Sequence, residues 1–182
     1  PTCPYRAKKA WSDPLDASFA YDWKSALPAP ALFGQFDDRH SMGTIMAGLL
    51  NLGFDEVEEV APAADVTANR VAAMLRAGRY TLPAISSSCP AVLRLVQIRY
   101  PSLLDHVLPL LSPMELAARR AKARHECSGK NVGVFFISPC AAKITDSRSP
   151  LGIRKSAVDA VIGIKDLYLQ LRSALGRVKE EL

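Results

Sequence analysis

Long apolar runs are missing from this sequence of 182 residues. A helix that crosses a bilayer needs roughly 18 to 20 consecutive apolar residues, and no stretch approaches that length. A charged-then-apolar leader is also missing at the start of the chain. We therefore expect a cytoplasmic protein with no membrane partner.

Local metal and nucleotide signatures are missing as well. The four cysteines show no C-x-x-C spacing, which excludes a zinc ribbon. Neither G-x-G-x-x-G nor G-K-S/T occurs, so loops that cradle a phosphate at helix N-termini are only a weak alternative. The three histidines have no carboxylate at metal-site spacing, and we expect them to be solvated: His40, His106 and His125.

Basic charge is present but not concentrated. The formal net charge is +5, yet the basic residues are scattered, except for a cluster at residues 119–124. A cluster of this size is typical of a solvated helix face, and we expect no nucleic-acid partner.

An initiator methionine is also lacking, because the chain begins at Pro1. We expect a piece of a longer protein, with residues 1–25 as a lead-in and residues 26–182 as one domain. A composition of 49% hydrophobic and 23% charged residues supports an ordinary globular core in that domain.

The most informative stretch is residues 131–143, NVGVFFISPCAAK. Its short run of β-branched and aromatic residues predicts a parallel strand that is buried on both faces. Cys140 follows the strand and can begin a helix. Ligands gather at the carboxyl ends of strands in open α/β sheets, so Cys140 lies where chemistry is usually done.

A second segment repeats this order. Residues 82–88 form a short run that ends in Cys89 and Pro90, with the proline in the first turn of a helix. We predict a second strand here, so that both thiols emerge at one edge of a sheet. Helix-start amides favour a thiolate, which makes each cysteine a nucleophile or a metal ligand; a plain buried cysteine is the alternative. No other candidate functional residues converge on Cys127, so we expect it to have no role in the site.

Strands and helices alternate along the rest of the chain. The apolar stretch at residues 26–33 contains two prolines, which favour a strand end or an edge strand. Alternation of this kind predicts an α/β fold with a mostly parallel sheet of about four to five strands and helices on both faces. Further strands are predicted at residues 56–61 and 158–164, and helices at residues 42–49, 68–75 and 167–178. A capping box formed by Ser112 and Glu115 predicts the start of another helix.

Four segments together resemble the catalytic large-subunit domain of iron-only hydrogenases. They are APALFGQF at residues 29–36, SSSCPAV at 86–92, RYPSLLDHVLPLLSPM at 99–114 and FISPCAAK at 136–143. In that family the domain has two α/β lobes, and the H-cluster, a 4Fe-4S cubane joined through a cysteine to a di-iron centre, lies between them. The resemblance implies that residues 26–182 are the first lobe.

By that resemblance, Cys89 and Cys140 match two cysteine ligands of the cubane, and Lys143 matches the lysine that hydrogen-bonds a cyanide of the di-iron centre. Pro30 and Ala31 match the segment that lines the cyanide pocket.

Cys3, followed by proline, resembles the last cysteine of a ferredoxin motif and implies a separate cluster. The partners implied are the second lobe and a ferredoxin-like domain of the parent chain, together with an electron carrier.

Departures from the family pattern are equally informative. Ser88 occupies the position of a proton-relaying cysteine, while Ser138 and Asp146 replace a methionine and a glutamate of the second motif. The third motif, with two more cysteines, is absent, so no complete cluster can form on this chain alone. These changes resemble divergent members of the family and imply redox or hydrogen sensing, or slow hydrogen oxidoreduction. The alternative is a cluster-free regulatory or interaction module that keeps only the fold.

Overall fold

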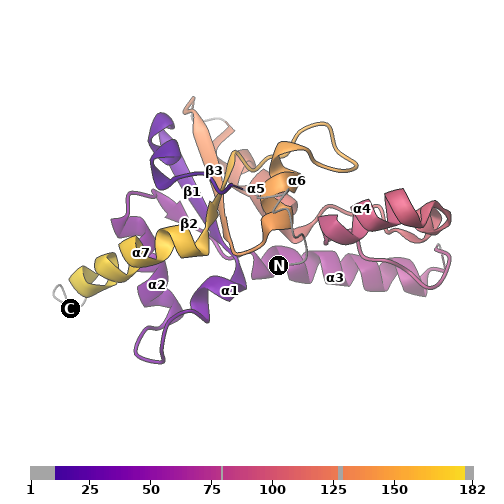
Figure 1. Ribbon diagram of the computed structural model, residues 1–182, viewed down its shortest axis with the longest axis horizontal. Coiled ribbons are helices and arrows are strands. Elements are labelled where there is room, and N and C mark those ends of the chain that lie inside the picture. The colour runs from indigo at the N-terminus through magenta and orange to yellow at the C-terminus, as the bar shows by residue number, and fades with distance from the viewer. Residues whose placement is uncertain (1–10, 79, 127–128, 179–182) are drawn as a thin grey trace, which may run out of the picture.

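The computed structural model describes residues 11–78, 80–126 and 129–178 (Figure 1). It confirms the α/β class, because strands and helices alternate and all strand pairs are parallel. The strands are β1 (Trp23–Pro28), β2 (Glu56–Val57), β3 (Val132–Ser138) and β4 (Ala160–Gly163). The α-helices are α1 (Pro30–Phe33), α2 (Met42–Asn51), α3 (Ala61–Arg76), α4 (Pro90–Arg99), α5 (Pro113–His125), α6 (Ala141–Arg148) and α7 (Ile164–Val178), and two 3₁₀ helices are η1 (Leu15–Ala20) and η2 (Pro101–His106).

The four strands form one sheet in the order β2-β1-β3-β4. β3 is central, and six of its residues are buried. Alternate side chains of β3 face two separate cores, as the period of two in a strand requires. Phe135 and Ile137 belong to one core, and Val134 and Phe136 to the other. The sequence prediction of a strand covered on both faces is therefore confirmed.

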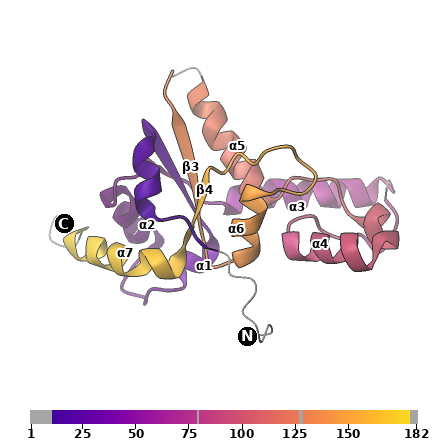
Figure 2. The same ribbon diagram turned by 45° about the horizontal axis from the view of Figure 1, so that its top comes forward.

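Helices cover both faces of this sheet (Figures 1 and 2). α2 and α7 pack on the first core through Leu49, Leu171 and Leu175. α3, α5 and α6 pack on the second, where Ala118 and Ile144 are buried. At Gly133 an added Cβ would lie 2.5 Å from Cγ of Tyr21, so only glycine allows this ring to pack against the strand.

The predicted strand at residues 82–88 is wrong. This segment does not join the sheet, and Ile85 alone forms an isolated parallel bridge with Val107. Pro83 has no N–H to donate to a ladder, Ser86 and Ser88 bond to each other, and the Ser87 hydroxyl donates to the Leu110 carbonyl at 2.7 Å. Cys89 therefore enters the site from a loop and not from a strand.

The predicted strand at residues 56–61 is also shorter than expected. β2 has two residues, and α3 begins at Ala61, because Pro62 is favourable in the first helical turn. α3 then runs for 16 residues and projects from the sheet together with α4 (Figure 1). Within the described residues, no helix is long and apolar enough to cross a bilayer.

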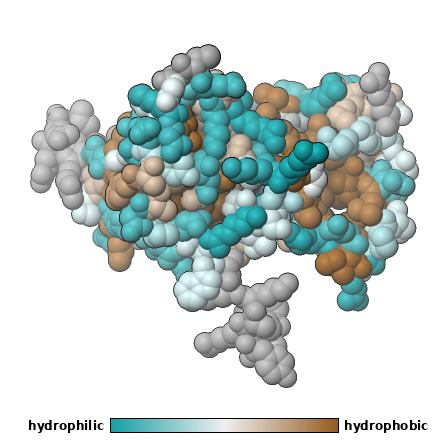
Figure 3. All heavy atoms as spheres, turned by 90° about the horizontal axis from the view of Figure 1, so that it is seen from above, coloured by the Kyte–Doolittle hydropathy of each residue, from teal (hydrophilic) through white to brown (hydrophobic). Residues whose placement is uncertain are grey.

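The projecting helices form an arm with little core of its own. Only Ala63 of α3 is buried, and the apolar residues of the helix predicted at residues 68–75, including Val71, Ala72 and Leu75, stay partly or largely exposed. Apolar atoms gather on the surface at this end of the molecule (Figure 3). The large apolar side chains exposed on the arm and the segments beside it are Val66, Leu75, Leu82, Val92, Leu95, Ile98, Tyr100 and Leu104.

The described part of the predicted lead-in belongs to this fold. β1 begins at Trp23, so the predicted boundary at residue 26 falls inside the strand. Pro28 is the last residue of β1, so the prediction of a strand end at these prolines is confirmed. The alternative of an edge strand is wrong, because β1 lies between β2 and β3. Asp13 pairs with Val161 on the edge strand β4 through two hydrogen bonds of 2.9 Å, one to its side chain.

Candidate functional site

Cys140 lies where the central strand reaches the carboxyl edge of the sheet. It is the N-cap residue of α6, in an extended conformation, and its thiol is free and exposed. Its backbone N–H donates to Oγ of the buried Ser138 at 3.2 Å, and its carbonyl accepts from Lys143 N at 3.0 Å. The amides at this helix end favour a negatively charged sulfur or ligand.

Cys89 occupies the same position on a second helix. It is the N-cap residue of α4, again extended, with Pro90 in the first turn and a free, exposed thiol. Its carbonyl accepts from Leu93 N at 3.1 Å, which is the first helical hydrogen bond. The predicted cysteine-then-helix order is thus confirmed at both positions, although only one of the two follows a strand.

Lys143 connects the two cysteine loops. It extends from α6, and its Nζ donates to the carbonyl oxygen of Ser88 at 2.8 Å, the residue directly before Cys89. A bond between residues 55 positions apart fixes the start of α4 against α6. The structure therefore brings together the two segments that the sequence analysis paired, by a side chain and not by strand pairing.

The ammonium group of Lys143 is partly withdrawn from water. Burial lowers its pKa below the usual value, and the negative charges of Asp146, Cys140, Cys89 and Glu115 partly oppose that shift. Both sulfurs therefore lie within electrostatic range of the same cation. A poorly solvated cation that is influenced by both thiols suits an anionic ligand group.

Pro30 and Ala31 reach the same edge of the sheet. They are the first two residues of α1, which follows β1 directly, and both are exposed. Pro28 pairs with Ile137 in register, and Ala29 N donates to the Ile137 carbonyl at 2.9 Å. The loop after β1 thus lies beside the loop that carries Cys140, since their strands are neighbours.

Ser88 has local partners. Its hydroxyl accepts a hydrogen bond from the Ser86 hydroxyl at 3.2 Å, and its N–H donates to Ser86 Oγ at 3.3 Å. Its side chain is partly buried at the end of the loop. The hydroxyl therefore stabilises the turn before Cys89.

The described residues fit only part of an iron–sulfur ligand set. A cubane needs four ligands, normally cysteine thiolates, and the free thiols here are Cys89 and Cys140. Within the described ranges, no group of three or more His, Cys, Asp or Glu side chains is placed to hold a metal. The two thiols and Lys143 fit one side of such a group. Cys3 lies outside the described residues.

Two acidic side chains near this site were not predicted as functional. Glu115 was expected to complete a capping box, and Ser112 Oγ does accept from its N–H at 3.3 Å. Its carboxylate, however, is buried and accepts from Ser156 Oγ at 2.7 Å and from Ala157 N at 3.0 Å. Asp146 is half-buried, and burial raises its pKa. Ser156 and Ala157 lie about 40 positions from Glu115, so no local pattern could have revealed these two partners.

Comparison with known proteins gives one matching family. The profile described as iron only hydrogenase large subunit, C-terminal domain, matches residues 24–178. The periplasmic [Fe] hydrogenase large subunit of Nitratidesulfovibrio vulgaris is 28% identical over 169 residues, which cover 82% of this chain and 40% of that protein. Iron hydrogenase 1 of Clostridium pasteurianum is 29% identical over 143 residues, 72% of this chain and 25% of that protein. The chain thus spans less than half the length of these curated relatives.

Solved structures agree with this match. A variant of the [FeFe]-hydrogenase HydA1 from Chlamydomonas reinhardtii superposes with a TM-score of 0.67 over 82% of this chain and 42% of that chain, at 24% identity. A HydA structure described as revealing stepwise H-cluster assembly gives a TM-score of 0.65 at 25% identity, over 82% and 42% of the two chains.

Proposed function

Because this chain belongs to the family formed by the C-terminal domain of iron-only hydrogenase large subunits, we propose that it contributes Cys89 and Cys140 to an iron–sulfur centre of a longer protein. The observation that carries the proposal is the 2.8 Å hydrogen bond from Lys143 to Ser88, which joins the two cysteine loops through one partly buried cation. A plain structural role for two cysteines would not need both thiols exposed at helix starts.

Each residue of this chain at the proposed centre has its own role. Cys89 and Cys140 hold iron, Lys143 fixes their spacing and faces an anionic ligand group, and Pro30 and Ala31 line the edge of the site. When bound, an H-cluster would supply electron storage and hydrogen activation. The remaining thiolates come from a second lobe, since the described residues supply two.

Ser88 supports a sensing or slowly reacting protein. A general acid works best when its pKa lies near the working pH; an ordinary cysteine, at about 8.5, meets this condition and a serine hydroxyl does not. In addition, the Ser88 hydroxyl accepts a hydrogen bond from Ser86 within the turn. We therefore infer redox or hydrogen sensing, or slow hydrogen oxidoreduction, in the longer protein.

The exposed arm supports a covering partner. Five large apolar side chains of α4 and the adjoining η2 segment are exposed: Val92, Leu95, Ile98, Tyr100 and Leu104. Contiguous exposed apolar surface marks an interaction site. The second lobe is its proposed partner, with a ferredoxin-like domain that contains Cys3 and an electron carrier as further partners. The free thiols support a reducing, cytoplasmic location, unlike that of the periplasmic relative.

Iron analysis of the longer protein tests the proposal. After anaerobic reconstitution with iron and sulfide, Cys89→Ser and Cys140→Ser should each lower bound iron and acid-labile sulfide by one cluster per chain. Cys127→Ser is the matched control and should keep the full content. Equal iron in all four proteins would reject the assigned ligands. No iron in any of them would favour the cluster-free regulatory or interaction module.

A further inference from the structure

A cavity of about 460 Å³ lies behind the Cys89 loop. Its walls come from four segments that are distant in sequence: the Ser87 loop with α4, residues 104–111, the start of α5, and the end of α6 with the loop at residues 150–156. The volume is within the range of roughly 300 to 1,000 Å³ that is typical of small-molecule sites. No role for this cavity follows from the metal centre proposed above.

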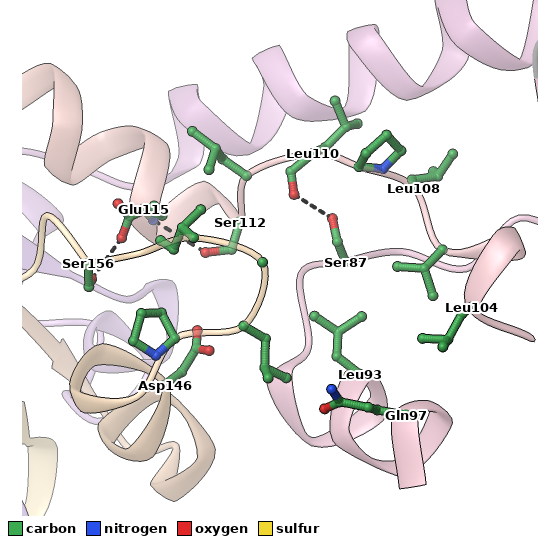
Figure 4. A pocket seen from close by; sticks show the side chains of 17 residues that line it. Ser87, Leu93, Gln97, Leu104, Leu108, Leu110, Ser112, Glu115, Asp146 and Ser156 are labelled. Carbon is green, nitrogen blue, oxygen red and sulfur yellow. Dashed lines mark hydrogen bonds between the residues drawn. The ribbon is translucent and has the colours of Figure 1, made fainter. Parts of the chain in front are cut away.

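The cavity has two chemically different ends (Figure 4). Glu115, Ser112, Ser156 and Asp146 lie together at one side. The other side is formed mainly by aliphatic side chains, including Leu93, Leu104 and Leu108, with Gln97 as a neutral polar neighbour. An occupant with a polar head and a hydrocarbon body matches this division.

Charge at the polar end has a single sign. Glu115 and Asp146 are the only charged side chains among the described residues that line the cavity. Glu115 already has its partners, because Ser156, Arg119 and Ala157 all donate to its carboxylate. Its capacity for a ligand is therefore largely used.

Asp146 is the acceptor that remains. No side chain in the described part of the protein donates a hydrogen bond to it. Burial raises its pKa, and Glu115 on α5 adds to that shift, while Lys143 on α6, the backbone N–H of Leu151 and Arg94 on α4 oppose it. Arg94 is directed to a backbone carbonyl at 2.9 Å and does not line the cavity. A charged donor entering the cavity would relieve the cost of a poorly solvated carboxylate.

We propose that this cavity binds a small primary amine, with its ammonium group on Asp146 and its hydrocarbon body between Leu93, Leu104 and Leu108. A cation is favoured over a neutral donor because the charged groups of the lining are both carboxylates. An anionic ligand is excluded by the same two groups. The site is independent of iron, so it can be present or absent whatever the outcome at Cys89 and Cys140.

The test uses this chain with three probes that share a six-carbon chain and differ in the head group: hexylamine, 1-hexanol and hexanoate. Binding is measured by calorimetry and located by chemical-shift changes at Leu93, Leu104 and Asp146. Hexylamine should bind at least about tenfold more tightly than 1-hexanol, since hydrogen bonds to charged groups are the stronger ones. Hexanoate should not bind. Equal affinity for the amine and the alcohol overturns the proposal.

Two variants separate the two ends of the site. Asp146→Asn should weaken hexylamine binding at least about tenfold and leave 1-hexanol binding unchanged. The control is Asp105→Asn, which removes an exposed carboxylate on η2 and should change the binding of neither probe. Leu93→Trp should fill the cavity and abolish binding of both probes, with the fold verified by its spectrum. Unchanged binding in either Asp146→Asn or Leu93→Trp contradicts the assignment.

A pH series adds a separate readout. Hexylamine binding should strengthen as the pH rises through the raised pKa of Asp146, where the carboxylate ionises, and weaken again near the pKa of the amine, about 10.4 for a comparable ammonium. In Asp146→Asn the lower limb should disappear. A lower limb that persists in the variant rules out Asp146 as the acceptor.

Discussion

Ser88 is the residue at which the chemistry of the proposed centre is most easily changed. Replacing it by cysteine restores an acid of suitable pKa beside Cys89. In the longer protein, loaded with equal iron, Ser88→Cys should raise hydrogen uptake and evolution at least about tenfold, because general-acid groups contribute roughly 10²–10⁴-fold. Ser86→Cys, two residues away, is the matched control and should give no gain. An unchanged rate, with the cluster intact by its spectrum, would show that Ser88 acts only in the turn.

Lys143 should act as a positioning residue. Lys143→Gln removes the charged donor to the Ser88 carbonyl. Amide hydrogen exchange in residues 84–92 should then become roughly tenfold faster, as expected for the loss of a hydrogen bond worth about 1.5 kcal/mol. Lys165→Gln removes the same charge from an exposed site on α7 and should leave this exchange unchanged. Equal rates in both variants would mean that the loop does not need the lysine.

Asp146 makes stability depend on pH. Its folded-state pKa is raised, so between the unfolded value near 3.8 and the folded value the native chain binds more protons, and stability falls as the pH rises. Asp146→Asn should therefore be more stable than the wild type at pH 7, by less than about 1 kcal/mol because water screens a half-buried group. The gap should close as the pH is lowered below both values. Urea titrations at several pH values measure it; a gap that is constant with pH contradicts the assignment.

Individual site residues were predictable where local order carried the signal. Cys89 and Cys140 each precede a helix, and proline or a buried strand beside them marks that boundary. The role of Glu115 was not predictable, because a capping box marks only the start of a helix, whereas the partners of its buried carboxylate are distant in sequence. The bond from Lys143 to Ser88 joins two loops that no pattern relates.

At the scale of elements, α3 and α4 are helices as predicted, yet their apolar side chains are largely uncovered: Leu95 is 51% and Ile98 is 72% exposed. The period of the apolar residues indicates that one face of the helix will be covered, but it does not identify the partner that covers it. The segment at residues 82–88 failed differently, since a short apolar run does not distinguish a strand from a loop that closes on Val107.

The arm can be tested by two substitutions on one helix. Ile98→Lys places a charge on the exposed face of α4 and should change the stability of this chain by less than about 0.5 kcal/mol. Val96→Ala, only two residues away but 4% exposed, should cost about 1 to 2 kcal/mol. In the longer protein the order of the two effects should reverse when cluster content is measured, because Ile98→Lys should disturb the contact with the second lobe and lower cluster content more than Val96→Ala. Chemical denaturation and iron analysis give the two readouts; an unchanged cluster content in Ile98→Lys would leave the arm without the proposed partner.

For the whole molecule, alternation of strands and helices sufficed to predict a parallel α/β sheet, because consecutive parallel strands need crossovers and the crossovers here are helical. The strand order and the use of residues 11–25 were not predictable. Asp13 joins the sheet edge by pairing with Val161, and Arg148 at the end of α6 donates to Asp13 at 2.7 Å and to the Trp11 carbonyl at 2.9 Å. These contacts attach the start of the described chain to the helix that follows Cys140.

The number of thiols on this lobe sets what the 182-residue chain can hold by itself. The described residues present two exposed thiols per chain, too few for the four ligands of a cubane, but two chains together present four. Anaerobic reconstitution of this chain alone should therefore give fewer than four irons per chain, and any cubane formed should bridge two chains. Light scattering with iron analysis distinguishes the states, because a bridged cluster appears only in a dimer and disappears with Cys89→Ser. A monomer that carries four irons per chain would show that ligands other than Cys89 and Cys140 complete the site, and would overturn the requirement for a second lobe.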